Sequence, residues 1–194
     1  ATVDKYGFTR EQQDDYAITS LTRAQNAANA GHFDTEIAPV SFTTRKGDVT
    51  ISADEQPPKA KPEKIPTLRP AFRKDGTVTA AHSASISDGA AAMVMMRQSE
   101  AEKRGLKPLA KIMGHATHAQ EPCWFTTAPI DSIKKVLAKT GWSKDDVDLW
   151  EINEAFAVVA MAAMRDLDLD HGKVNIHGGA CALGHPIGAT GARL

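Results

Sequence analysis

Five glycines stand within the fifteen residues from His177 to Gly191, together with two histidines and a cysteine. Glycines at this density let a backbone approach a ligand closely. The segment lacks the Gly-Lys-Ser/Thr ending of a phosphate-binding loop, and its glycine spacing is not that of a dinucleotide-binding loop. His185 lies between Gly184 and Pro186, where its ring cannot belong to an apolar stripe. We therefore interpret the His185 imidazole as a functional group.

Asn153 stands between the apolar segment Leu149–Ile152 and an apolar helix predicted from Glu154 to about Leu167. It has two interpretations. Its side chain caps the helix, or it presents a carboxamide at the carboxyl end of a strand, where α/β folds place ligands. An amide together with the His185 imidazole makes a hydrogen-bonding pair suited to a developing oxyanion.

A transition-metal site is a separate possibility, because His177, Cys181 and His185 follow one another at intervals of four residues. On a helix, these three side chains would share one face. The glycines between them and the proline that follows disfavour a helix, so we predict no metal here.

The overall composition excludes several classes of protein. The chain has 194 residues with 23 basic and 24 acidic side chains, a balance that argues against a nucleic-acid binder. The longest apolar run, Ala155–Met164, is about half of a membrane span, so we expect no membrane segment. Two cysteines exclude a disulfide framework and indicate a reducing compartment, so we expect a cytoplasmic protein. A first residue other than Met and a last segment that enters a helix suggest part of a larger protein.

Strands alternating with helices predict an α/β fold. A capping box at Thr9–Gln12 predicts a helix to about Ala30, ended by Gly31. The other predicted helices are 99–105, one that starts at Pro129 and ends before Gly141, and 154–167, and the predicted strands are 36–42, 48–52, 77–79, 109–115, 149–152 and 174–176. Five prolines within 53–72 predict an extended segment without regular structure. This segment and the residues after it are basic, which suits either a solvated linker or a loop facing a polyanionic ligand; the basic residues are Lys59, Lys61, Lys64, Arg69, Arg73 and Lys74.

The motif Asn153-Glu-Ala-Phe-Ala157, followed by the glycine-rich segment Gly178–Arg193 with its Gly-His-Pro triplet, resembles the thiolases, which are acyl-CoA C-acyltransferases. Further blocks stand in family order at Arg10–Asp14, Ala53–Glu55, Leu68–Phe72, Gly76–Ala80 and Ser87–Ala91. The resemblance implies a thiolase-like layered α/β fold. In it, residues 1–86 are the later part of a CoA-covering loop domain, and residues 87–194 are a C-terminal thiolase domain, truncated at its end. The sequence around Asn153 is more similar to acetoacetyl-CoA thiolases than to long-chain ones.

The resemblance also implies a mechanism, the Claisen condensation or thiolytic cleavage of a 3-ketoacyl-CoA. His185 would raise the thiolate population of a nucleophilic cysteine and donate to the thioester oxygen, and Asn153 would hold a water that completes the oxyanion hole. The two cysteines of the mechanism would lie before Ala1 and beyond Leu194, so the chain alone is expected to be inactive. Coenzyme A thioester would be the substrate, with no separate cofactor. Family members form homo-oligomers, and we expect an isolated half to expose Ala155–Met164.

The family pattern also marks a CoA-binding set: Leu68, Phe72, Ala80, Ser83, Ala84, Ser85, Phe125, Ala155 and Phe156. Ala84 stands where the family has a serine that bonds pantetheine, and Ser83 or Ser85 would compensate. His82 replaces an asparagine, and Pro57-Pro58 replaces an arginine. A second hypothesis, a non-catalytic thiolase-like acyl-CoA-binding protein, rests on Ala84, on His82 and on the lack of both mechanistic cysteines in these residues.

Overall fold

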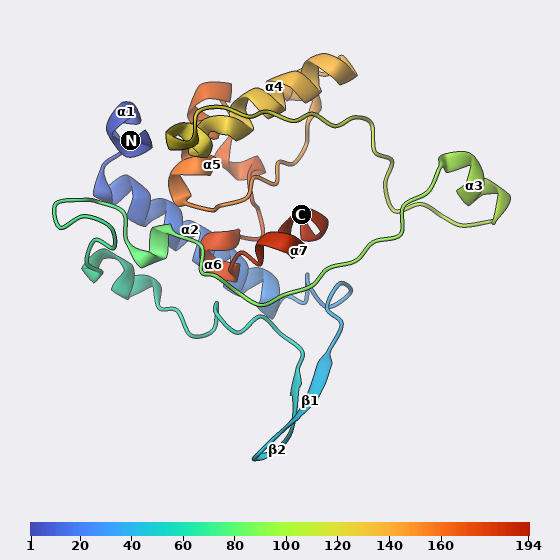
Figure 1. Ribbon diagram of the computed structural model, residues 1–194, viewed down its shortest axis with the longest axis horizontal. Coiled ribbons are helices and arrows are strands. Elements are labelled where there is room, and N and C mark those ends of the chain that lie inside the picture. The colour runs from blue at the N-terminus through green and yellow to red at the C-terminus, as the bar shows by residue number, and fades with distance from the viewer.

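Helix α2 (Arg10–Asn29) crosses the body of the molecule, and the C-terminal helices pack around it in the computed structural model, which describes residues 1–194 (Figure 1). Helices α5 (Ala157–Leu167) and α4 (Ala128–Thr140) lie above it in this view, with α1 (Thr2–Tyr6) at their side. The short helix α6 (Ala180–Leu183) lies in front of α2, and α7 (Ile187–Arg193) follows it at the C-terminus. The first and last parts of the sequence therefore share one body.

The signals at the ends of α2 and α4 are confirmed. The Thr9 side chain accepts from the Gln12 amide, and the Gln12 side chain accepts from the Thr9 amide, so both halves of the capping box are present. Gly31 after α2 and Gly141 after α4 both take the left-handed conformation, each with φ of 75°. Because glycine has no Cβ, it adopts this conformation without steric cost.

Helix α5 forms the centre of the core, since every residue from Ala157 to Ala163 is buried. Phe8, Tyr16, Ile152 and Val174 pack in the same cluster. The expectation that Ala155–Met164 is exposed was therefore wrong: α1, α2 and α4 cover most of this run. The exposed apolar side chains lie elsewhere, chiefly at Met93–Met96, Leu109, Ile112 and Met113.

The predicted hairpin is present as β1 (Val40–Thr44) and β2 (Gly47–Ile51), an antiparallel pair that projects from the body (Figure 1). Its strands lie within a few residues of the predicted ones. The proline-rich segment that follows does contain regular structure, a 3-10 helix at Pro62–Thr67, so that expectation was wrong. Pro62 is accommodated because the first residues of a helix need no intrahelical N–H bond.

The other predicted strands do not form ladders. Thr79 and Pro70 make one isolated bridge, Trp150 and Val174 make another, and residues 109–115 are extended but unpaired. Helix α3 (Gln98–Lys103) stands apart from the body in Figure 1. Two extended arms join it to the body: residues 86–97 lead to it, and residues 106–120 lead away from it. A strand is stabilised by pairing with a neighbour, and residues 1–194 provide no neighbour for these segments.

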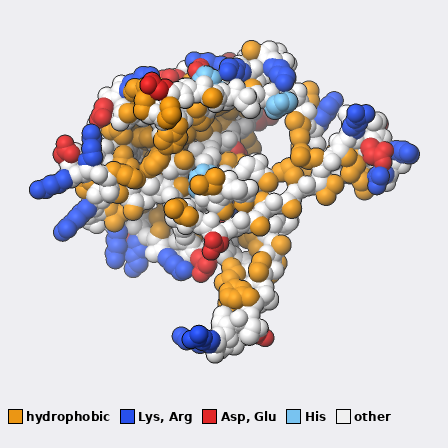
Figure 2. Space-filling view, viewed as in Figure 1, with side chains coloured by type: hydrophobic (Ala, Val, Ile, Leu, Met, Phe, Trp, Pro, Cys, Tyr) orange, Lys and Arg blue, Asp and Glu red, His pale blue; other side chains and the backbone are white.

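Two surface properties bear on function. No helix is long and apolar enough to span a bilayer. Lys and Arg side chains gather at the lower left of the space-filling view (Figure 2), over the segment that is teal in Figure 1. All six basic residues between positions 59 and 74 are exposed.

Candidate active site

Three segments distant in the sequence meet at the site: 83–87, 153–156 and 184–190. The backbone N–H of His185 donates to the Ser85 carbonyl at 3.0 Å, which ties the third segment to the first. The His185 Nε2 lies 3.3 Å from the Asn153 amide nitrogen, Nδ2. The imidazole and the carboxamide that the sequence singled out are therefore direct neighbours, although 32 residues separate them.

The position of Asn153 depends on how the segment before it, residues 150–152, pairs with residues 174 and 175. The parallel bridge between Trp150 and Val174 stops after one rung, since Asn175 turns into the left-handed region with φ of 47°. The Asn175 side chain then accepts from the Ile152 N–H and donates to the Ile152 carbonyl, both at 2.8 Å. The Asn153 side chain does not cap α5, which begins at Ala157 with Phe156 as its N-cap, so the capping interpretation was wrong. Its Oδ1 is buried and has no hydrogen-bond partner.

Glu154 fixes the glycine-rich loop beside this strand end. Its side chain has 0% exposure, and its oxygens bond to neutral donors. Oxygen Oε1 accepts from Tyr16 and Asn175 at 2.8 and 2.9 Å, and Oε2 accepts from Ser20 and the Cys181 N–H at 2.8 and 3.1 Å. Burying a carboxylate costs free energy unless its oxygens are hydrogen-bonded, and here four neutral donors supply those bonds.

The glycine-rich loop can pack directly against the Glu154 carboxylate because residue 179 is a glycine. A Cβ at Gly179 would overlap the Glu154 carboxylate. Burial and the nearby Glu154 charge both raise the pKa of Tyr16 and of Cys181 well above their usual ranges. The Cys181 thiol, which donates to the Glu154 carbonyl oxygen, is therefore protonated and a poor nucleophile.

An open apolar cleft of about 330 Å³ contains three phenyl rings. The Phe156 ring makes edge contacts with Phe72 and Phe125, with centroids 5.8 and 6.1 Å away. Phe72 is 66% exposed and Phe125 53%, and grouped exposed aromatic side chains are typical of binding surfaces. A smaller hollow of about 200 Å³ is lined by Asn153, Gly184 and Thr190 among others. The segment 153–156 thus contributes to both spaces.

The structure brings some of the predicted CoA-binding residues together and leaves others apart. Ala84 donates its N–H to the Ala155 carbonyl at 3.1 Å, and Ser83 pairs with Phe156 in an antiparallel bridge. The Ser83 hydroxyl donates to the Thr79 carbonyl, and the Ser85 hydroxyl contacts Ser87 and Gln56. Leu68 and Ala80 do not line the apolar cleft.

The three residues considered as metal ligands do not form a site. The His177 ring stacks on His32 with centroids 4.5 Å apart, Cys181 faces Glu154, and His185 faces Asn153. No group of three or more His, Cys, Asp or Glu side chains is arranged to hold a metal ion.

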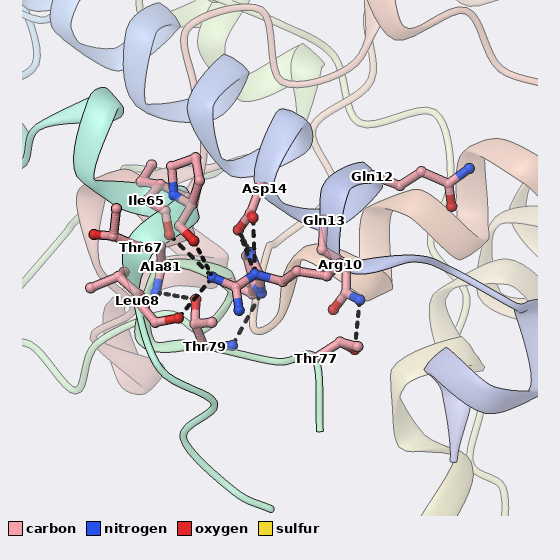
Figure 3. A network of polar contacts seen from close by, with 12 residues as sticks. Arg10, Gln12, Gln13, Asp14, Ile65, Thr67, Leu68, Thr77, Thr79 and Ala81 are labelled. Atoms are coloured by element: carbon pink, nitrogen blue, oxygen red, sulfur yellow. Dashed lines mark hydrogen bonds and ion pairs between the residues drawn. The ribbon is translucent and has the colours of Figure 1, made fainter. Parts of the chain in front are cut away.

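A network of polar contacts that the sequence motifs did not predict is centred on Asp14 and precedes segment 83–87 through His82 (Figure 3). The Arg10 Nε lies 2.9 Å from both Asp14 carboxylate oxygens, and Arg10 also donates to the Leu68 carbonyl. The fully buried His82 contacts Asp14 through Nε2 at 2.7 Å and accepts the Thr79 N–H at Nδ1. Burial lowers the pKa of His82 despite Asp14, so the ring is neutral at pH 7 and donates to Asp14 from Nε2. In the sequence, the only sign of this network was His82, which stands where the family resemblance implies an asparagine.

Comparison with known proteins gives matches along almost the entire chain. The model of the thiolase N-terminal domain matches residues 1–99, and that of the thiolase C-terminal domain matches residues 106–194. A probable acetyl-CoA acetyltransferase of Dictyostelium discoideum is 50% identical over 98% of this chain and 46% of its own length. A Mus musculus relative named cytosolic acetyl-CoA acetyltransferase is 49% identical over 98% of this chain and 49% of its own.

Solved structures agree. The acetyl-CoA acetyltransferase of Bacillus anthracis superposes with a TM-score of 0.95 at 44% identity, over 99% of this chain and 49% of that one. A thiolase of Ascaris suum, solved in complex with coenzyme A, gives 0.92 at 45% identity over the same shares. The predicted thiolase-like α/β fold is confirmed, and the chain spans about half the length of the curated relatives it matches. On the two domain models, and on likeness along its whole length, the chain belongs to the thiolase family.

Proposed function

We propose that the protein containing this chain is a thiolase-type acyltransferase that cleaves or forms a 3-ketoacyl-CoA, with acetoacetyl-CoA as the favoured substrate. The observation that carries the proposal is the 3.3 Å approach of the His185 imidazole to the Asn153 carboxamide, at the hollow that Asn153 and Thr190 line. Relatives named acetyl-CoA acetyltransferases at about 50% identity support the reaction class.

His185 and Asn153 have distinct roles in this proposal. The imidazole takes the proton of a cysteine thiol, and the resulting thiolate attacks the thioester carbonyl. Once protonated, the imidazole donates to the oxygen on which negative charge develops. The Asn153 amide, through a water, supplies a second donor to the same oxygen. Coenzyme A enters as part of the substrate, so the proposed chemistry uses no separate cofactor.

The nucleophile in this proposal lies outside residues 1–194. Cys181 is unsuited because burial raises its thiol pKa and its Sγ–H already faces the Glu154 carbonyl. Cys123 is exposed at the rim of the apolar cleft, on a different segment from His185. We therefore expect the 194-residue chain to be inactive by itself.

Coenzyme A is the proposed ligand of the apolar cleft and its surroundings. The exposed rings of Phe72 and Phe125 offer contacts to a pantetheine arm, and the basic residues between positions 59 and 74 offer charge to nucleotide phosphates. The Ascaris suum thiolase, which was solved with coenzyme A, supports this assignment.

We further propose a homo-oligomer located in the cytoplasm. The cytosolic relative of Mus musculus supports that location, whereas a relative from Bos taurus is named mitochondrial.

The test is thiolysis of acetoacetyl-CoA by the protein expressed from its complete coding sequence. His185→Ala should lower kcat by about 1,000-fold or more, and Asn153→Ala by about 100- to 1,000-fold. His115→Ala, at an exposed histidine on one of the arms, is the matched control and should keep full activity. Retention of normal turnover by His185→Ala would remove that residue from the mechanism.

A non-catalytic acyl-CoA-binding protein is the second candidate, favoured by Ala84, where the family has a serine. It predicts that the complete protein binds coenzyme A in a calorimetric titration but shows no thiolysis. Turnover together with binding would exclude it.

A further inference from the structure

The His185 imidazole is contacted at both of its nitrogens. Nε2 lies 3.3 Å from Asn153 Nδ2, and Nδ1 lies 2.8 Å from the hydroxyl oxygen of Thr190. Because an amide nitrogen can only donate, Nε2 accepts and carries no proton. The proton of the neutral ring is then on Nδ1, which donates to Thr190.

The Thr190 hydroxyl is itself oriented by its helix. Its Oγ1 donates at 3.1 Å to the carbonyl of Pro186, the N-cap residue of α7, one turn earlier. A hydroxyl has a single proton, and this contact uses it, so lone pairs of Oγ1 face the His185 Nδ1. Thr190 is only 7% exposed, which limits competition by water.

We propose that Thr190 is a positioning residue that holds His185 as the Nδ1–H tautomer and so keeps Nε2 unprotonated, with a lone pair that can accept a proton once the contact with Asn153 is released. The inference rests on the proposed function, in which His185 deprotonates the nucleophilic thiol. In that step the S–H bond breaks and an Nε2–H bond forms, which leaves a thiolate and an imidazolium. The imidazolium still donates from Nδ1 to Thr190, so the ring does not turn during the transfer. The other tautomer has no lone pair on Nε2 and cannot take the proton there.

The decisive measurement is the tautomer itself. Long-range ¹H–¹⁵N correlation spectra of the complete protein, labelled in its histidines, show which ring nitrogen is protonated, and His185→Gln identifies the His185 signal. We expect Nδ1–H in the unsubstituted protein. Thr190→Val matches the shape of threonine without the hydroxyl and should shift the ring toward Nε2–H, whereas Thr190→Ser should restore Nδ1–H. Nε2–H in the unsubstituted protein, or unchanged Nδ1–H in Thr190→Val, would overturn the proposal.

Kinetics add a second readout. Thr190→Val should lower kcat for acetoacetyl-CoA by about tenfold or more, with KM within about twofold and recovery in Thr190→Ser, because a general base fails in the wrong tautomer. Thr140→Val is the matched control, since the Thr140 hydroxyl makes the same one-turn bond to the Val136 carbonyl in α4 and bonds to no histidine. It should change neither tautomer nor kcat. An equal loss in both variants would assign Thr190 a purely structural role.

The tautomer spectrum does not depend on turnover, so the two proposals fail separately. Absence of thiolysis contradicts the proposed function, and an unchanged tautomer contradicts the role of Thr190.

Discussion

Helix α2 carries two buried polar networks that are built in opposite ways. The Asp14 carboxylate bonds to the Arg10 guanidinium and to the His82 imidazole, so it keeps one partner if the other is removed. At Tyr16 and Ser20, the helix meets the Glu154 carboxylate, which neutral donors alone satisfy. The first network stands behind segment 83–87, and the second holds Asn153 and the glycine-rich loop. Helix α2 thus supports two parts of the site. One rests on the Asp14 carboxylate with its charged partner Arg10, and the other on the single Glu154 acceptor.

Because of this difference, the two networks should respond differently to the loss of one side chain. Loss of His82 leaves Asp14 with Arg10, whereas loss of the Glu154 acceptors leaves several buried donors unpaired at once. Buried groups without partners cost more than the bonds themselves contribute. The network with one centre should therefore be the more sensitive of the two.

Glu154→Gln should have the largest effect, a decrease of about 3 kcal/mol in the free energy of unfolding. The new amide nitrogen would face donors where an oxygen now accepts. Urea unfolding followed by circular dichroism measures the change. Glu151→Gln, three residues earlier and exposed, is the control and should stay within about 0.5 kcal/mol. Equal stability of the two variants would show that Glu154 is not the centre of its network.

His82→Asn should cost less, about 2 kcal/mol. The shorter side chain keeps an acceptor for the Thr79 N–H but loses the bond to Asp14, whose carboxylate retains Arg10. The same unfolding measurement applies, with His115→Asn as the exposed control. A loss larger than that of Glu154→Gln would reverse the comparison.

Arg10→Lys should cost about 1 kcal/mol. Lysine keeps the charge beside Asp14 but cannot reproduce the fork that also reaches the Leu68 carbonyl. Thermal unfolding of this variant beside Lys59→Arg, an exposed control, measures the effect. If Arg10→Lys proved as stable as the parent, charge alone would explain the pairing with Asp14.

The pH dependence of stability should show the smallest effect. Burial lowers the pKa of His82 in the folded state below the ordinary value of about 6.5, and burial followed by Arg23 lowers that of His171. As pH falls below about 6.5, the unfolded chain binds protons that the folded chain refuses, so stability decreases. His82→Asn should show a shallower decrease between pH 7 and 5, with the His171 contribution remaining. An identical slope would mean that His82 does not contribute to it.

The sequence predicted the features that depend on neighbouring residues. The capping box at Thr9, the glycine stop at Gly141 and the approach of Asn153 to His185 all follow from short motifs, the last through family resemblance. The strands were predicted less well, because pairing depends on a distant segment, as at Trp150 and Val174. The bond between Asp14 and His82 spans 68 residues and leaves no periodic signal.

The Asn175 side chain finishes the hydrogen bonding of Ile152 as a neighbouring peptide group would. The extended segment that ends at Ile152 therefore has its backbone groups satisfied, although the bridge beside it does not continue as a ladder. Because the Asn175 amide bonds to both the N–H and the carbonyl of Ile152, it fixes the backbone from which Asn153 begins. The position of Asn153 is therefore set by this ring of bonds on one side and by the Glu154 bonds to the glycine-rich loop on the other.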